Sequence, residues 1–223
     1  MFANSRRIES TQSSPHPRLN EIVRKHLTEP YRRRPSAAGR AAVAAVADRL
    51  ALAPFILDAG CGTGASTVAL AHAFPGRWVL GVDKSAVRLA TGLRLIDGSA
   101  APANALLLHC ELVDFWQLAA AAGLRCERQF LLYPNPWPKP EYLKRRWHAH
   151  PVLPALLAVG GSIELRTNWQ VYAEEFAEGL RLSGVVACVQ RMEAENPLTP
   201  FERKYAASGH ALWRVEAPLS NAR

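Results

Sequence analysis

Residues 131–147, LLYPNPWPKPEYLKRRW, combine side chains that suit a nucleic-acid ligand. The stretch contains four prolines, two tryptophans, one asparagine and four basic residues. Prolines restrict the backbone angles, tryptophans stack on unpaired bases, and basic side chains neutralise phosphates. We therefore expect a stiff, positively charged loop that binds RNA. A charged helix start with partly buried tryptophans has the same composition, so this structural alternative stays open.

A second candidate site is DAGCGTG, residues 58–64, which separates an apolar run from a helical stretch. Gly60, Gly62 and Gly64 lack Cβ atoms, so the backbone can turn tightly and approach a ligand. The loop has no GK[ST], which excludes a P-loop. With Ala65 it satisfies the looser pattern GxGxx[GA], so a nicotinamide dinucleotide is a possible ligand.

Acidic residues follow the next two apolar runs. Asp83 ends one of them, where a carboxylate can accept hydrogen bonds from both hydroxyls of a ribose. The sequence DKSA would also suit a helix N-cap at this position. Glu111 follows the third run, where it could reach an adenine amino group; by itself it could equally be a surface glutamate. The pattern indicates a nucleoside-containing cofactor.

These residues must be positioned by a sheet of parallel strands. Short apolar runs alternate with helix-like stretches, at residues 55–57, 78–83, 105–109, 130–134 and 162–168. This alternation predicts an α/β fold, a doubly wound parallel sheet covered on both faces. Ligands of such sheets bind beyond the carboxyl ends of the strands. Segments 184–191 and 211–216 have no long helix between them and predict an antiparallel pair at the sheet edge.

The chain has 223 residues and a formal net charge of +8. We expect a basic N-terminal arm at 1–53, one folded domain at 54–216 and a short tail at 217–223. Within the arm we expect disorder over residues 1–17, a helix from Arg18 and a second helix from Ala37 to Leu52. A basic arm attracts polyanions, or it is simply a solvated surface.

The remaining composition limits the function classes. The four cysteines are widely spaced and show no zinc-site pattern, so we expect them reduced and expect no metal. The N-terminus lacks the apolar stretch of a secretion signal, and no run of eighteen apolar residues occurs. We therefore expect a cytoplasmic protein without a membrane partner, either a monomer or a homodimer.

Several motifs occur together in the order of one family. DAGCGTG, GVD, YPNPWPK, LRTNW and PLTPFERK, followed by GHALWR, resemble the bacterial tRNA (guanine-N7)-methyltransferase family, the TrmB-like enzymes. The resemblance implies a Rossmann-like class I methyltransferase sheet of seven strands, the last antiparallel. It also implies S-adenosyl-L-methionine as cofactor, tRNA as partner, and methyl transfer to N7 of a guanine in the variable loop.

The resemblance assigns roles to residues at matching positions. Asp58 matches a glutamate at the methionine end of the cofactor, Asp83 matches the ribose-binding acid, and Glu111 stands beside the adenine. The glycines of the loop and Asn135 complete the expected cofactor site. At matching positions the resemblance implies substrate binding by Lys139, Thr199, Pro200, Phe201 and Glu202, with Asn168 facing the base. The composition of the basic loop adds Lys144, Arg145 and Arg146 as expected substrate-binding residues.

The chain departs from the family at Asn135 and Asn168, where the family usually has aspartate. Guanine N7 carries a free lone pair, so no proton has to leave and catalysis is mainly alignment. Asn135 can therefore act as the catalytic, aligning residue. An amide accepts from fewer donors than a carboxylate, so the target base is left open, with Glu202 as the remaining acid.

Three other functions remain possible. The NPW sequence partly matches the [DN]PP[YFW] loop of methyltransferases that act on exocyclic or amide nitrogen, which suggests altered specificity, including another RNA base. A non-catalytic RNA-binding relative would keep the basic loop and lose methyl transfer. A nicotinamide-dependent oxidoreductase would use the same glycine loop and bind NAD saturably.

Overall fold

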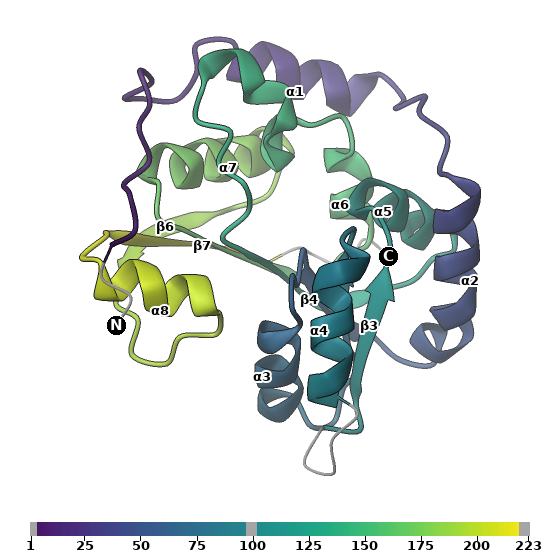
Figure 1. The fold of residues 1–223 in the computed structure, drawn as a ribbon. Coiled ribbons are helices and arrows are strands. Elements are labelled where there is room, and N and C mark those ends of the chain that lie inside the picture. The colour runs from purple at the N-terminus through teal and green to yellow at the C-terminus, as the bar shows by residue number, and fades with distance from the viewer. Residues whose placement is uncertain (1–3, 97–101, 219–223) are drawn as a thin grey trace. The chain divides into compact units, whose positions relative to one another are not determined.

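The computed structural model describes residues 4–96 and 102–218, and these residues form two compact units (Figure 1). We call residues 33–96, 102–132 and 155–162 the glycine-loop unit. Residues 4–32, 133–154 and 163–218 form the proline-loop unit. Each unit is described by itself. The expected boundary at residue 54 stays a prediction, although the two helices expected in the arm fall in different units.

Seven strands are hydrogen-bonded in the order β3-β2-β1-β4-β5-β7-β6. Their bounds are β1 Phe55–Ala59, β2 Val79–Asp83, β3 Ala105–His109, β4 Cys126–Leu132, β5 Ser162–Thr167, β6 Cys188–Met192 and β7 Leu212–Pro218. The pairs β1–β2, β2–β3 and β1–β4 are parallel, and β6–β7 is antiparallel. The predicted doubly wound α/β sheet with an antiparallel last strand is therefore confirmed, as is the predicted edge pair.

In the glycine-loop unit, apolar strands explain the sheet and its core. All five residues of β1 and of β2 are buried, as continuous apolar runs in a covered parallel sheet should be. The helices are α2 Ala37–Ala51, α3 Ala65–Ala73, α4 Ala86–Ile96 and α5 Leu112–Ala121; α6 spans Leu153–Ala158. Helices α3 and α4 contact each other, β2 and β3, while α2 contacts α5.

In the proline-loop unit, the predicted first helix is confirmed as α1, Leu19–Thr28. Leu19, Ile22 and Val23 are buried, and the helix contacts α7. The other helices are η1 Pro140–Arg145 and η2 Trp147–Ala149, both 3-10 helices, α7 Gln170–Leu182 and α8 Pro200–Ala207. Helix α7 also contacts β6 and β7, so α7 is the central helix of this unit.

Residues 4–17 form an extended segment, so the expectation of disorder was wrong for these residues. In Figure 1 the segment runs from α1 down to α8. Ser5 N donates to Ser208 Oγ at 3.2 Å, and Ser10 Oγ donates to Pro138 O at 2.5 Å. Composition reports how much apolar surface a segment can bury, but this segment is ordered by hydrogen bonds to distant residues.

Among the helices of the described residues, none is long and apolar enough to span a membrane.

Helix α2 is joined to α5 through one buried carboxylate, that of Asp114. Ser36 caps α2 by accepting from Gly39 N at 2.9 Å. The same hydroxyl donates to Asp114 Oδ2 at 2.7 Å, and Ser36 N donates to that oxygen at 3.0 Å. Arg33 Nη2 lies 3.2 Å from Asp114 Oδ1. Asp114 comes this close because residue 39 is glycine; a Cβ there would lie 2.7 Å from Asp114 Oδ2.

Replacing Asp114 with asparagine should lower the free energy of unfolding by about 1–3 kcal/mol, because the amide turns an NH2 group toward Arg33 or toward the Ser36 donors. Urea unfolding at neutral pH measures the effect. The matched control is Asp48→Asn on the exposed face of α2, which should change stability by less than about 0.5 kcal/mol. Equal stability of both variants would contradict the role given to Asp114.

Candidate cofactor and substrate site

The loop between β1 and α3 consists of glycines in the left-handed region. Gly60, Gly62 and Gly64 have φ of 82°, 59° and 74°, which other residues rarely adopt. A Cβ built on Gly62 would meet nothing within 4 Å. The backbone at Gly62 is therefore open to a ligand, and a side chain at this position would occupy the space that a ligand needs.

Asp83 ends β2 and is bonded directly to this loop. Gly62 N donates to Asp83 Oδ2 at 3.0 Å, and Ser85 N donates to Oδ1 at 2.8 Å. The N-cap that the sequence allowed at Asp83 is formed by Ser85 instead, whose Oγ accepts from Arg88 N at 3.3 Å. The carboxylate of Asp83 is thus held beside the open glycine backbone, and its ribose-binding role stays a prediction.

Asp58 is the penultimate residue of β1 and lies in a more enclosed environment. Its side chain is buried, and Oδ2 accepts from Ser66 Oγ at 2.6 Å and Thr67 Oγ1 at 2.7 Å. Burial raises the pKa of Asp58 to about 6; the two hydroxyls act in the opposite direction, and the charge of Asp83 adds to the rise. Asp58 therefore changes charge close to neutral pH, and a nearby cation would favour its ionised form.

Glu111 is the third strand-end carboxylate, and it is exposed. It precedes α5 as the N-cap residue, but its side chain makes no capping hydrogen bond. Lys84 Nζ lies 3.9 Å from Glu111 Oε1, a weak surface contact. Strand register pairs Asp58 with Gly81 and Asp83 with His109. These acids supply hydrogen-bond acceptors, and together with the open glycine backbone they fit a nucleoside cofactor that carries an ammonium group.

Gly92 is a site residue that the sequence reasoning missed. It lies in α4, and a Cβ at this position would be 2.7 Å from the carbonyl oxygen of Thr63. Only a glycine lets the helix approach the glycine loop this closely. A glycine in a helix interior, at ATGLRL, was the available signal.

The loop after β4, residues 133–139, has two residues in the left-handed region. Tyr133 and Trp137 have φ of 52° and 46°, which is uncommon for aromatic residues. Trp137 N donates to Asn135 Oδ1 at 3.1 Å, a local turn typical of asparagine. Asn135 is exposed at the tip of this turn. Its oxygen already has one donor, and its amide NH2 group remains available.

The expected phosphate-binding cations of the loop divide into two groups. Lys139, Lys144 and Arg145 are exposed. The Arg145 guanidinium lies 4.6 Å from the Trp137 ring centroid and 4.5 Å from that of Tyr142. This stacking orients a cation at the surface, and the three side chains stay candidates for phosphate contacts.

Arg146 does not belong with them. Its side chain is completely buried. Nε and Nη2 donate to Trp137 O at 3.2 and 3.0 Å, and Nη1 donates to Glu175 Oε2 at 2.5 Å. The prediction of direct substrate binding by Arg146 is corrected: this residue holds the backbone of the loop.

Glu175 of α7 is the partner that makes this burial possible. Its Oε2 accepts from Arg146 and from His148 Nε2, the latter at 3.0 Å. Its Oε1 accepts from Gln12 Nε2 at 2.6 Å and His16 N at 2.8 Å. Burial alone would raise the pKa of Glu175, but His148 and Arg146 outweigh it and lower the pKa to about 2. Glu175 is therefore ionised at all ordinary pH values.

The TPFE sequence forms the start of α8. Thr199 is the N-cap, and its side chain accepts from Glu202 N at 2.9 Å; Pro200 follows as the first helical residue. Phe201 is 54% exposed. Glu202 is buried, with Oε1 bonded to Arg166 Nη1 at 2.8 Å.

The Glu202 carboxylate is only half satisfied. Its Oε2 is buried without a hydrogen-bond partner among the described residues, and the same holds for the hydroxyl of Tyr133. Burial raises the pKa of Glu202, while Arg166 acts in the opposite direction. A buried acceptor without a donor is costly, so a ligand that supplies an N–H group would relieve it. Arg166, which also binds Glu164 Oε1 at 2.7 Å, was not anticipated from the sequence.

Asn168 follows β5 and is half-buried. Its Nδ2 lies 3.0 Å from His210 Nδ1. This contact of His210 with an expected substrate residue was not foreseen from the sequence.

All four cysteines are free. Cys61, Cys110 and Cys126 are buried, and burial raises the pKa of each thiol. Buried thiols of this kind are poor nucleophiles.

A family model described as "Putative methyltransferase" matches residues 52–215. A tRNA (guanine-N(7)-)-methyltransferase of Shewanella pealeana is 30% identical over 169 residues, which are 71% of this chain and 70% of the relative. The chain belongs to this methyltransferase family. The resemblance noted from the motifs is thereby confirmed.

Two further relatives have the same name. The protein of Mycolicibacterium gilvum is 36% identical over 170 residues, 70% of this chain and 64% of the relative. The protein of Burkholderia ambifaria is 31% identical over 168 residues, which are 72% of this chain and 65% of the relative. The chain thus spans slightly less than two thirds of the length of these two methyltransferases.

Solved structures with the same fold include the 16S rRNA methyltransferase KamB, with a TM-score of 0.59 and 18% identity over 79% of this chain and 94% of that one. A 16S rRNA (adenine(1408)-N(1))-methyltransferase from Catenulisporales acidiphilia gives a TM-score of 0.59 and 19% identity over 81% and 92%. At these identities the likeness establishes the methyltransferase fold.

Glu175→Gln should lower the free energy of unfolding at pH 7 by about 3–5 kcal/mol, because the Arg146 charge loses its counter-charge while buried. Ionised Glu175 stabilises the folded state above its unfolded pKa near 4.5, and the wild type loses this contribution as pH falls toward 2. The variant should lack that loss, which urea unfolding between pH 7 and pH 3 measures.

The neighbouring Glu174→Gln is the matched control, because Glu174 bonds only Gln170 among the described residues, at 2.8 Å. Its expected effect is below about 0.5 kcal/mol at every pH. If Glu175→Gln behaves like this control, the buried pair does not hold the loop.

Proposed function

We propose that the chain transfers a methyl group from S-adenosylmethionine to tRNA, at N7 of a guanine. The observation that carries the proposal is the bond from Gly62 N to Asp83 Oδ2, beside glycine backbone that is open at Gly62. Loop and acid form one cradle, and this cradle fits the ribose and carboxypropyl parts of such a cofactor. With tRNA as the substrate, we also propose a cytoplasmic location for the chain.

The cofactor, when bound, supplies a methyl group on a positively charged sulfur. Asp83 would accept from the ribose hydroxyls, Glu111 would lie beside the adenine, and Asp58 would attract the ammonium group. The backbone of Gly60, Gly62 and Gly64 would pass along the chain of the cofactor. With these contacts the cofactor would bind at the carboxyl ends of β1, β2 and β3, where such folds bind their ligands.

Guanine N7 provides the electron pair of the new nitrogen–carbon bond, and the carbon–sulfur electrons return to sulfur. No proton has to be removed, so the residues of the proline loop act by alignment. Asn135 would orient the base with its amide NH2 group, while the left-handed turn at Trp137 keeps that asparagine at the loop tip. Methylated N7 carries a positive charge, so acceptors near the base also stabilise the product.

Base recognition would use the remaining residues of the proline-loop unit. Glu202 Oε2 lacks a partner among the described residues, and guanine has N–H donors on its Watson–Crick edge. Phe201 is exposed enough to stack on a base. The phosphate contacts would come from Lys139, Lys144 and Arg145, with Arg146 acting through the loop backbone.

Transfer to an exocyclic nitrogen is less well supported. That chemistry needs the asparagine oxygen to accept from the amino group of the substrate. Here Asn135 Oδ1 already accepts from Trp137 N. N7 methylation makes no such demand on the oxygen, and the geometry therefore favours it.

The direct test is methyl transfer from labelled S-adenosylmethionine to unmodified tRNA transcripts, followed by nucleoside analysis. We expect 7-methylguanosine, and we expect much slower transfer to a transcript whose variable-loop guanine is replaced by adenosine. Another methylated nucleoside would establish altered specificity instead. Measurable cofactor binding without transfer to any transcript would indicate a binding-only relative, and saturable NAD binding would overturn the methyltransferase assignment.

The affinity for S-adenosylmethionine should fall as pH is lowered through about 6, where Asp58 becomes protonated. The ionised carboxylate attracts the ammonium group of the cofactor, so its loss weakens binding by up to about tenfold per pH unit. Calorimetry between pH 5 and pH 8 checks this. Asp58→Asn should bind weakly at all pH values, whereas Glu111→Gln should keep the pH dependence. A flat wild-type profile would remove Asp58 from the cofactor site.

A further inference from the structure

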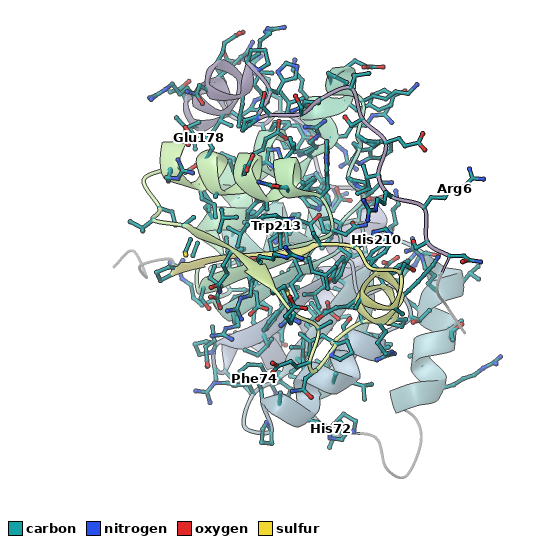
Figure 2. The ribbon with its side chains drawn as sticks, turned by 90° about the vertical axis from the view of Figure 1, so that its left-hand side faces the viewer. Arg6, His72, Phe74, Glu178, His210 and Trp213 are labelled. Carbon is teal, nitrogen blue, oxygen red and sulfur yellow. The ribbon has the colours of Figure 1, made fainter. Side chains whose placement is uncertain are left out.

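His210 connects an expected substrate residue to the N-terminal segment. Its Nδ1 lies 3.0 Å from Asn168 Nδ2, and its Nε2 lies 3.0 Å from the carbonyl oxygen of Ser5. Ser5 is held in turn, because its N–H donates to Ser208 Oγ at 3.2 Å. In Figure 2 His210 lies beside α8, on the side along which the N-terminal segment with Arg6 passes.

The carbonyl of Ser5 determines the tautomer of His210. A carbonyl oxygen can only accept, so Nε2 must carry the proton that it donates to Ser5. In a neutral imidazole, Nδ1 is then an acceptor. The group that faces Nδ1 must therefore be the NH2 of Asn168, whichever way the amide would otherwise turn.

The position of the Asn168 oxygen follows from this. With Nδ2 bonded to His210, Oδ1 is on the opposite side of the amide, and it has no hydrogen-bond partner among residues 4–96 and 102–218. We propose that His210 is a specificity-determining residue, which fixes the Asn168 amide so that a hydrogen-bond acceptor and not a donor faces the substrate base. This inference rests on the proposed function.

The ring of His210 is well placed to act as a fixed support. It stacks on Tyr205 with centroids 5.2 Å apart and planes at 24°. Tyr205 stacks in the same way on Phe201, at 6.1 Å and 26°. The imidazole therefore cannot turn over without breaking the stack and both hydrogen bonds, so the orientation of the amide is set before a base arrives.

The same contact accounts for an amide at position 168. An aspartate would place an acceptor oxygen against the unprotonated Nδ1, and the two lone pairs would repel. Asparagine provides one donor for His210 and keeps one acceptor for the ligand. Asn168 stands where the family usually has aspartate, and from the sequence this difference left the target base undetermined. The asparagine nevertheless keeps one of the two acceptor oxygens that an aspartate would offer.

A fixed acceptor selects among bases. Guanine presents N1–H and N2–H2 donors on its Watson–Crick edge, whereas adenine presents the N1 acceptor beside its N6 amino group. A free amide can rotate to offer oxygen or NH2 and so can pair with either base. An amide held by His210 offers oxygen alone, which favours guanine and leaves adenine N1 opposite another acceptor.

The test compares His210→Ala and His210→Asp with the wild type on two tRNA transcripts that carry guanine or adenine at the methylated position. The measured quantity is the ratio of kcat/KM values, guanine over adenine. Alanine frees the amide, so the ratio should fall about tenfold. Aspartate offers only acceptors to the Asn168 NH2 and should keep the ratio within about twofold of the wild type, even if its charge weakens RNA binding overall.

An unchanged ratio in active His210→Ala would overturn the proposal. If His210→Ala is inactive, the His210→Asp variant decides. A wild-type ratio in His210→Asp supports the proposal, and a lower ratio or a loss of transfer in His210→Asp overturns it. Long-range 1H–15N NMR of the wild type gives a readout that needs no activity: we expect Nε2–H with an unprotonated Nδ1, and the opposite tautomer would overturn the proposal. If the wild type shows the expected tautomer but methylates no guanine, the proposed function is wrong, while the orientation of the Asn168 amide is established.

Discussion

The buried ion pair of Arg146 and Glu175 is the interaction on which the proline-loop unit depends. Two charges without solvent contact are stable only if their hydrogen-bonding groups are satisfied. Glu175 accepts from four donors, which come from η2, the N-terminal segment and Arg146. The guanidinium in turn donates to the carbonyls of Trp137 and Lys139. A single carboxylate on α7 therefore fixes three separate stretches of the chain.

This pair explains how the loop after β4, residues 133–139, keeps one backbone shape, which the proposed alignment of the substrate base requires. Two aromatic residues of the loop adopt left-handed backbone angles, a conformation that persists only when neighbours determine it. Arg146 binds the carbonyls on either side of Pro138, and Ser10 binds the carbonyl of Pro138 itself. The loop is thus shaped by its own chain and does not depend on the substrate for its form.

Short sequence patterns predicted those features of the fold that depend on neighbouring residues. The glycines after β1 form the tight turn that their lack of Cβ atoms predicts, and the apolar runs form buried strands. Residues whose role depends on distant partners were misjudged. Arg146 follows two exposed cations and so resembles a phosphate ligand, but its partner Glu175 lies 29 residues away. The order of residues 4–17 and the contact of His210 with Asn168 arise in the same long-range way.

The buried ion pair should order the loop after β4, residues 133–139, before any ligand binds. Amide hydrogen exchange of Trp137, measured by NMR on the protein without cofactor or RNA, tests it most directly, because this amide donates to Asn135 within the turn. We expect exchange slowed at least about a hundredfold relative to an unstructured chain. Exchange at the unstructured rate, with protection only after cofactor and tRNA are added, would contradict it and would make loop order a consequence of binding.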